Sequence, residues 1–132
     1  MSEDVVIDPT ANIINLAYTG VENINLSVPT EFVKALVLSG NVMSDFSFFQ
    51  FLPLLQVFHG DSMQLDGFEH IATDLLPKLT HMILRNNNFN TFDSLLASDS
   101  LQHLDVSLNN FVRGAEQSLS QSYPALKVLL FG

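Results

Sequence analysis

The chain contains no cysteine and no tryptophan. The absence of cysteine excludes disulfide bonds and thiolate zinc sites, and it favours a cytoplasmic or nuclear setting. The first ten residues, MSEDVVIDPT, are acidic where a secretory signal would be basic, and no apolar run approaches the roughly 18 residues that a membrane span needs. We therefore expect a protein that acts without a membrane, a metal or a cofactor.

Positive charge is also scarce, with 5 Lys and Arg against 14 Asp and Glu and a formal net charge of -9. The basic residues are scattered along the chain, as Lys34, Lys78, Arg85, Arg113 and Lys127. Binding to a phosphate backbone needs several clustered cations, so direct contact with naked nucleic acid is not expected. A protein partner, in the form of a peptide segment or a helix, fits this composition better.

Apolar residues are abundant, at 47% of 132 residues with 11 phenylalanines, which is enough for one domain with a buried core. Their spacing repeats. The stretch LTHMILRNNNF, residues 79–89, follows the pattern L-x-x-L-x-L-x-x-N-x-L. The same spacing recurs from Val33 to Met43 and from Leu101 to Phe111, with a weaker copy from Ala11 and a partial copy from Leu126.

The stretch VFHGDSM, residues 57–63, can be placed in two registers. One puts Leu55 and Val57 in the strand-core positions and makes the neighbouring repeats unequal. The other puts Phe58 and Gly60 there and gives spacings of 22, 22, 24, 22 and 25 residues through Ile14, Leu36, Phe58, Met82, Leu104 and Leu129. We adopt the second register, in which Gly60 and Met63 depart most from the pattern and a local cavity or bend is expected.

Residues 11 to 132 resemble the leucine-rich repeat family, in particular its short intracellular class with repeats of about 22 residues. That class includes the spliceosomal A-prime subunit, the phosphatase-1 regulatory subunit and the acidic nuclear phosphoprotein. The resemblance implies a single α/β solenoid of about six parallel strands on a concave sheet, with short helical or 3-10 returns on the convex side. Residues 1–10 would form a lead-in or cap, 11–111 the repeats, and 112–132 a C-terminal repeat or cap.

On the convex side, apolar residues every three positions after Asn41 predict a tight helical return, and 68–79 and 112–126 predict longer ones. Phe48 and Phe51 fall outside that spacing, and we expect them either to be partly exposed or to wrap a neighbouring repeat. The repeat asparagines Asn41, Asn87 and Asn109 carry amides that can satisfy backbone groups at each turn.

The register also predicts which side chains share the concave face, because equivalent positions of neighbouring parallel strands lie side by side. Histidines and charged residues then gather among apolar ones near the middle of this face. The resemblance implies a non-enzymatic protein that binds a partner, and an aromatic residue and an arginine suit such a contact. The predicted partner-binding residues are Tyr18, Val37, His59, Asp61, His81, Ile83, Arg85, His103 and Asp105.

Other interpretations remain open at this point. His81 and His103 could share a metal with His59 or Asp105, or the histidines could make a contact pH-sensitive. A hydrolase could use His59, Asp61 and Ser62, although no nucleophile turn accompanies them. The family resemblance also allows a ribonucleoprotein subunit that binds an RNA-recognition-motif protein, and the exposed edge of the C-terminal strand could support association.

Overall fold

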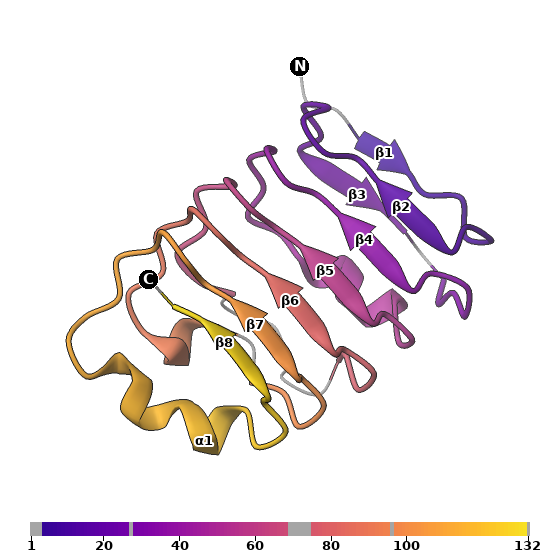
Figure 1. The fold of residues 1–132 in the computed structure, drawn as a ribbon. Helices are drawn as coiled ribbons and strands as arrows, with labels where there is room; N and C mark the ends of the chain where they lie inside the picture. Colours follow the sequence, from indigo (N-terminus) through magenta and orange to yellow (C-terminus); the bar gives the residue numbers. More distant parts are fainter. Residues whose placement is uncertain (1–3, 27, 69–74, 96, 132) are drawn as a thin grey trace.

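The computed structural model describes residues 4–26, 28–68, 75–95 and 97–131 (Figure 1). Its main feature is an open sheet of six short parallel strands, each three residues long, in the order β2-β4-β5-β6-β7-β8. These strands are β2 (Ile13–Asn15), β4 (Ala35–Val37), β5 (Val57–His59), β6 (His81–Ile83), β7 (His103–Asp105) and β8 (Val128–Leu130). The predicted parallel sheet of about six strands is therefore confirmed.

A second, smaller sheet lies at the N-terminal end of the molecule. It pairs β1 (Asp4–Val6) in parallel with β3 (Asn23–Asn25). Neither segment shows a long run of alternating apolar and polar residues, so sequence periodicity gave no sign of them. The segment expected as a lead-in therefore contains a strand.

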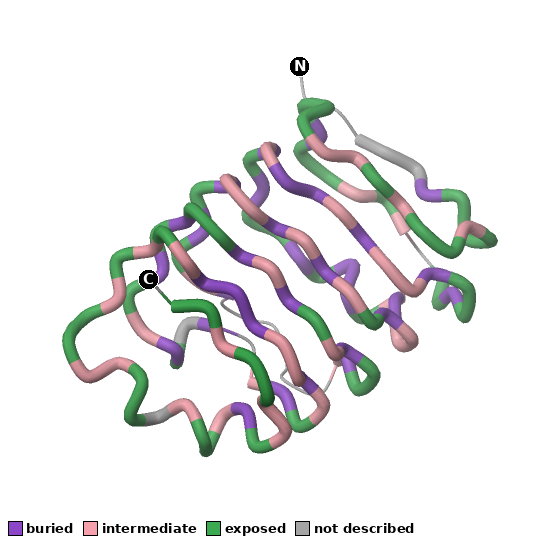
Figure 2. The backbone as a smooth tube through the Cα atoms, viewed as in Figure 1, coloured by how far each residue is buried: buried purple, intermediate pink, exposed green. Residues whose placement is uncertain are grey.

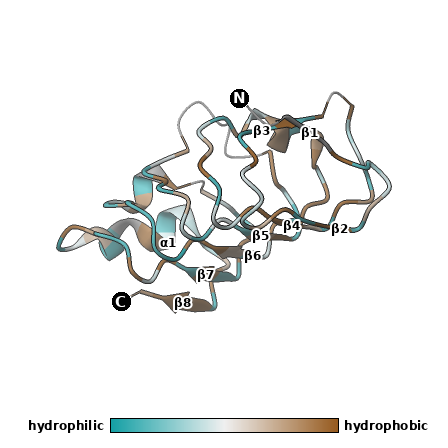
Figure 3. Cartoon of the chain, turned by 90° about the horizontal axis from the view of Figure 1, so that it is seen from above, coloured by the Kyte–Doolittle hydropathy of each residue, from teal (hydrophilic) through white to brown (hydrophobic). Residues whose placement is uncertain are grey.

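The returns between strands lie on one side of the six-stranded sheet, as Figure 3 shows. They include three 3-10 helices, η1 (Ser47–Phe51), η2 (Phe92–Ser94) and η3 (Ala115–Ser118), and the short helix α1 (Leu119–Ser122). The tight return after Asn41 and the helical return within 112–126 are confirmed. The return expected within 68–79 falls largely outside the described residues.

The core lies between the sheet and the returns, where Figure 2 shows the buried backbone segments. The middle residue of each inner strand points into it, and Leu36, Phe58, Met82 and Leu104 are all buried. Each such side chain contributes about 1.5–3 kcal/mol by leaving water. A group of phenylalanine rings from η1 and neighbouring returns packs beside them. Phe48 is buried within this group, so an exposed Phe48–Phe51 pair is excluded.

The strand pairing confirms the adopted register for residues 55–65. Val57 pairs with Ala35 and His81, which places Phe58 between Leu36 and Met82. Of the cavity or bend expected at Gly60 and Met63, a cavity at Gly60 is excluded. A Cβ added to Gly60 would lie 2.9 Å from the Phe58 ring and 3.1 Å from Leu84 Cδ2, so these neighbours already fill the space.

The repeat asparagines connect each turn to the preceding one, as their amides predicted. Asn87 Oδ1 accepts the backbone N–H groups of Met63 and Leu65 at 3.0 Å, and Asn87 Nδ2 donates to Gly60 O at 2.9 Å and Leu84 O at 3.1 Å. Asn41 and Asn109 make equivalent bonds. Met63 takes the asparagine position in its own repeat but has no amide with which to make these bonds.

A left-handed residue precedes the asparagine position in five successive repeats. These residues are Tyr18, Gly40, Ser62, Asn86 and Leu108, with φ between 54° and 75°. Glycine and asparagine adopt this conformation readily, whereas other side chains lose roughly 1–2 kcal/mol there. The turn geometry is therefore imposed by the repeat even where the local residue disfavours it.

Candidate functional site: the open sheet face

The side of the six-stranded sheet that faces away from the returns is the candidate site, here called the open sheet face. It is built from two rows of strand residues that the register places side by side. The amino row contains Ile13, Ala35, Val57, His81, His103 and Val128. The central row contains Asn15, Val37, His59, Ile83, Asp105 and Leu130. Both rows are those that the sequence register predicted.

Two of the predicted histidines are in direct contact. The rings of His81 and His103 stack with centroids 5.3 Å apart and an angle of 20° between planes. Thr80 Oγ1 lies 2.9 Å from His81 Nδ1, which fixes the orientation of that ring. His59 lies in the central row instead, between Val37 and Ile83. The structure therefore brings His81 and His103 into contact and places His59 in a different row.

Three charged residues lie toward the carboxyl ends of the strands. The Asp61 carboxylate accepts the backbone N–H of Arg85 at 3.1 Å, and Arg85 Nε lies 3.8 Å from Asp105 Oδ2. The Arg85 side chain is 51% exposed and that of Asp105 is 8% exposed, so the cation can reach solvent and the anion cannot. Such a half-exposed ion pair contributes little to stability, which leaves Arg85 free to exchange partners.

Burial raises the pKa of Asp61 above its usual range, and the negative charge of Asp105 adds to this effect. The backbone N–H of Arg85 and the charges of His59 and Arg85 act in the opposite direction. The carboxyl of Asp61 is thus partly desolvated just beyond the end of β5, beside the open sheet face, where a new hydrogen-bond donor would be favourable.

Asp105 has a structural role that the sequence rows did not indicate. Its Oδ1 accepts the backbone N–H of Ser107 at 3.1 Å and the Ser107 hydroxyl at 2.7 Å. Asn15, at the equivalent position of β2, accepts the N–H of Ala17 in the same way. Asp105 is therefore a buried turn residue, and the signal that could have identified it is the Asp-x-Ser spacing of a side-chain-to-backbone turn.

The remaining residues of the open sheet face and its rim differ in how far they are exposed. Tyr18, predicted at the rim, is 74% exposed and leans over Gly40. Val37 and Ile83 are half-buried in the central row. Three exposed apolar residues on the two outer strands, which the predicted site left out, are Ile13, Val128 and Leu130. Their exposure follows from their position at the sheet edges.

Within the described residues, the serine that the hydrolase interpretation needs makes no hydrogen bond to a histidine. Ser62 lies past β5 in the left-handed turn, and its hydroxyl accepts a hydrogen bond from Asn86 Nδ2 at 3.0 Å. A serine nucleophile would need its base within hydrogen-bond distance. Among the described residues, no group of three His, Cys, Asp or Glu side chains is arranged to hold a metal ion, so the proposed His81–His103 centre lacks its third ligand there.

Comparisons with known proteins leave the family open. No protein-family model matches the chain, and no curated protein matches it significantly. The resemblance to leucine-rich repeats therefore rests on the residue spacing alone. In the part of the chain that the structure describes, no helix is long and apolar enough to cross a membrane.

Proposed function

We propose that the chain is a leucine-rich repeat protein whose open sheet face binds a segment of a protein partner, without catalysis. The observation that supports this most strongly is the uncovered face itself. Parallel sheets are usually covered on both faces, because their strands are apolar on both sides. Here the returns cover one side, and the other presents half-buried Val37 and Ile83 to solvent.

The mixture of side chains on this face suits a protein segment. Apolar residues of the central row offer surface for burial, while Arg85 and the His81–His103 pair offer hydrogen-bond donors and stacking surfaces. Tyr18 provides an exposed aromatic ring at the rim of the same face. Aromatic and arginine side chains dominate binding energy at interfaces, so these residues are the expected anchors.

Site-specific photo-crosslinking tests the proposal. A photoreactive amino acid replaces Ile83 on the open face or, as a matched control, Val42, which is 61% exposed on a turn outside the face. Both proteins are irradiated in native cells, and mass spectrometry identifies the crosslinked peptides. We expect one partner segment from the Ile83 position and none of it from Val42. Equal crosslinking from both positions would move the binding surface elsewhere.

A purified partner then allows a direct measurement. Isothermal titration with the unmodified chain gives the affinity, and the same titration with face variants shows whether the crosslinked contact carries binding energy. Zinc titration of the chain alone provides the opposite test. Heat release together with a rise in melting temperature would favour a metal centre at the histidines over a binding surface.

A further inference from the structure

The segment that follows β5 and its turn contains a chemically labile pair of residues, Asp66 and Gly67. The backbone nitrogen of a residue can attack the side-chain carboxyl carbon of a preceding aspartate. Glycine favours this attack, because it has no Cβ to crowd the nitrogen and its backbone turns freely. No other aspartate of the chain precedes a glycine, and no asparagine precedes a glycine or a serine. The sequence therefore singles out this pair for a reaction between neighbours.

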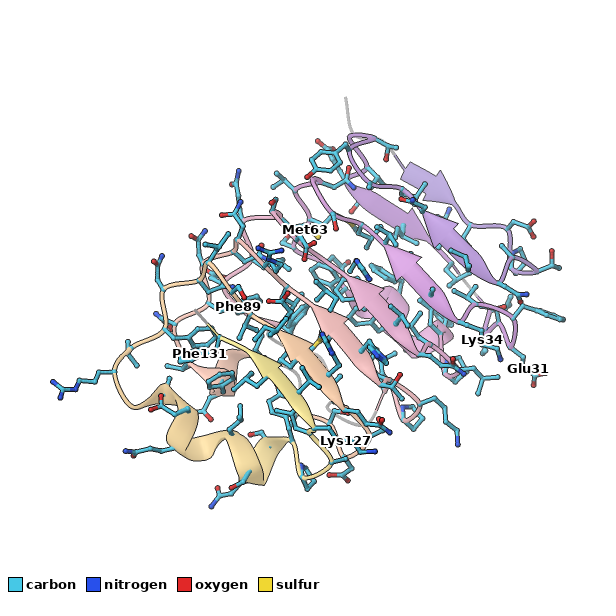
Figure 4. All side chains as sticks on the ribbon, viewed as in Figure 1. Glu31, Lys34, Met63, Phe89, Lys127 and Phe131 are labelled. Carbon is cyan, nitrogen blue, oxygen red and sulfur yellow. The ribbon has the colours of Figure 1, made fainter. Side chains whose placement is uncertain are left out.

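Both reacting groups of this pair are unoccupied. Asp66 is exposed and Gly67 is half-buried, and the segment forms neither a helix nor a strand. Within the described residues, the Asp66 carboxylate accepts no hydrogen bond and the Gly67 N–H donates none. Figure 4 shows Met63, shortly before the pair, at the edge of the molecule where the turns leave the sheet. The Gly67 nitrogen is therefore free to turn toward the carboxyl group of Asp66.

The aspartates that precede a serine are the next most reactive, and the fold restrains them. They are Asp61, Asp93 and Asp99. At Asp61 both reacting groups are engaged by Arg85, which lies in the next repeat. The Asp61 carboxylate accepts the Arg85 N–H at 3.1 Å, and the Ser62 N–H donates to the Arg85 carbonyl at 3.0 Å. The Ser62 nitrogen is thus held toward the neighbouring repeat and away from the Asp61 side chain.

The other two aspartates of this kind are restrained in different ways. After Asp99, the backbone N–H of Ser100 donates to the Ser98 hydroxyl at 3.2 Å, which holds the attacking nitrogen. Asp93 and the serine after it both lie within η2, where the helical backbone resists the rotation that ring closure needs. Local structure therefore leaves the pair at residues 66–67 as the most reactive one, in agreement with the sequence.

We propose that Asp66 is a site of spontaneous isomerisation to isoaspartate, through a succinimide formed with Gly67. The Gly67 nitrogen forms a bond to Asp66 Cγ, and one carboxylate oxygen leaves as water with the amide proton and a proton from solvent. Water then opens the ring. Cleavage at Cγ restores aspartate, whereas cleavage at the main-chain carbonyl carbon of Asp66 gives isoaspartate with a free α-carboxylate. The change needs no enzyme, oxidant or cofactor.

Isoaspartate lengthens the main chain, because the backbone then runs through the side-chain carbon. The residues on both sides are anchored. Buried Leu65 donates its N–H to Asn87 Oδ1 at 3.0 Å and accepts the Asn88 N–H at 2.7 Å. Phe68 is buried, and its ring lies against that of Phe46 with centroids 5.1 Å apart. The longer link between two fixed ends destabilises the fold. The site lies outside the two rows of the open sheet face, so this proposal is independent of the proposed function.

Prolonged incubation of the 132-residue chain in water enriched in heavy oxygen tests the proposal. Ring opening adds one labelled oxygen, and peptic digestion in ordinary water followed by mass spectrometry locates it. Electron-based fragmentation then separates isoaspartate from aspartate. Asp66→Glu removes the reactive carboxyl group, because its longer side chain closes a ring far more slowly. Asp99→Glu is the matched control at another exposed aspartate. A parallel incubation in urea shows which sites react without the fold.

In the folded chain and in Asp99→Glu, we expect label and isoaspartate at Asp66 alone, and neither at that position in Asp66→Glu. Urea should add label at the aspartates that precede serine. The incubated unmodified chain should unfold at lower urea than a fresh sample, whereas incubated Asp66→Glu should not change. A folded chain without label at Asp66 would overturn the proposal, whether or not urea restores it. Equal labelling of Asp66 and Asp61 in the folded chain would overturn it too.

Discussion

The ring of Tyr18 lies directly against the backbone of Gly40, in the position that a side chain at residue 40 would occupy. A Cβ added to Gly40 would come within 2.1 Å of the Tyr18 Cδ1 atom. Both residues hold the left-handed turn position of their repeats, with φ of 56° and 75°. Glycine at position 40 thus allows both the left-handed turn conformation and the close contact with the Tyr18 ring.

Gly40→Ala should lower the free energy of unfolding by about 2 kcal/mol, because it combines left-handed strain with displacement of the Tyr18 ring. Gly20→Ala is the matched control, since Gly20 has the same φ of 75° but nothing within 4 Å of an added Cβ. It should lower the free energy of unfolding by only about 1 kcal/mol. Urea denaturation measures both.

The contribution of the ring can be separated further. In a Tyr18→Ala background, Gly40→Ala and Gly20→Ala should have equal effects on the free energy of unfolding, because the clash is then gone. A difference that persists without the ring would assign the sensitivity of Gly40 to the backbone instead.

Asn87→Ala should lower the free energy of unfolding by about 3 kcal/mol, because it leaves several buried backbone groups without partners. These include the N–H groups of Met63 and Leu65 and the carbonyl of Gly60. Asn90→Ala is the control, at an exposed asparagine three residues further along the chain. Its unfolding free energy should change by less than about 0.5 kcal/mol. Comparable losses of unfolding free energy in the two variants would show that the hydrogen bonds of Asn87 do not stabilise the fold.

Tyr123→Phe should leave the chain equally stable or about 1 kcal/mol more stable at pH 7. Tyr123 is buried, and its hydroxyl has no hydrogen-bond partner within the described part of the chain. Removing the hydroxyl therefore removes an unsatisfied polar group while keeping the ring in the core. A clear loss of stability at pH 7 would show that the hydroxyl has a partner.

The same variant should change how stability depends on alkaline pH. Burial raises the pKa of Tyr123 well above its ordinary value of 10.0. As the pH rises through 10, the unfolded chain releases this proton while the folded chain keeps it, so the stability of the unmodified chain falls. Tyr123→Phe lacks this term, and its stability advantage should widen above pH 10. Parallel pH profiles in denaturant titrations would contradict the assignment.

Sequence spacing predicted the strand register because a repeat imposes the same inward positions on every strand. Phe58 could be placed beside Leu36 and Met82 for this reason, even though Val57 looked like a natural core residue. The predicted rows of the open sheet face followed from the same register. Sequence periodicity predicts burial wherever equivalent positions of successive strands are buried in the same way.

Other features depend on contacts that the spacing does not encode. Tyr18 and Leu108 adopt a conformation that their side chains disfavour, and only the repeat geometry requires it. Asp105 looked like an exposed residue of the binding face, but its hydrogen bonds to Ser107 turn it into the buried part of a turn. The β1–β3 pair was missed because neither strand falls at a strand position of the repeat.

Arg85→Glu should weaken binding of the crosslinked partner at least about tenfold, because it replaces a cation next to the open sheet face with a third carboxylate near Asp61 and Asp105. Ile83→Asp should do the same by placing a charge in the apolar central row. Both side chains reach solvent, so circular dichroism should be unchanged. Arg113→Glu, at an exposed arginine in the turn before η3, is the charge-matched control and should bind normally. Titration calorimetry with the purified partner measures all three. Full affinity in Arg85→Glu and Ile83→Asp would place the partner on another surface.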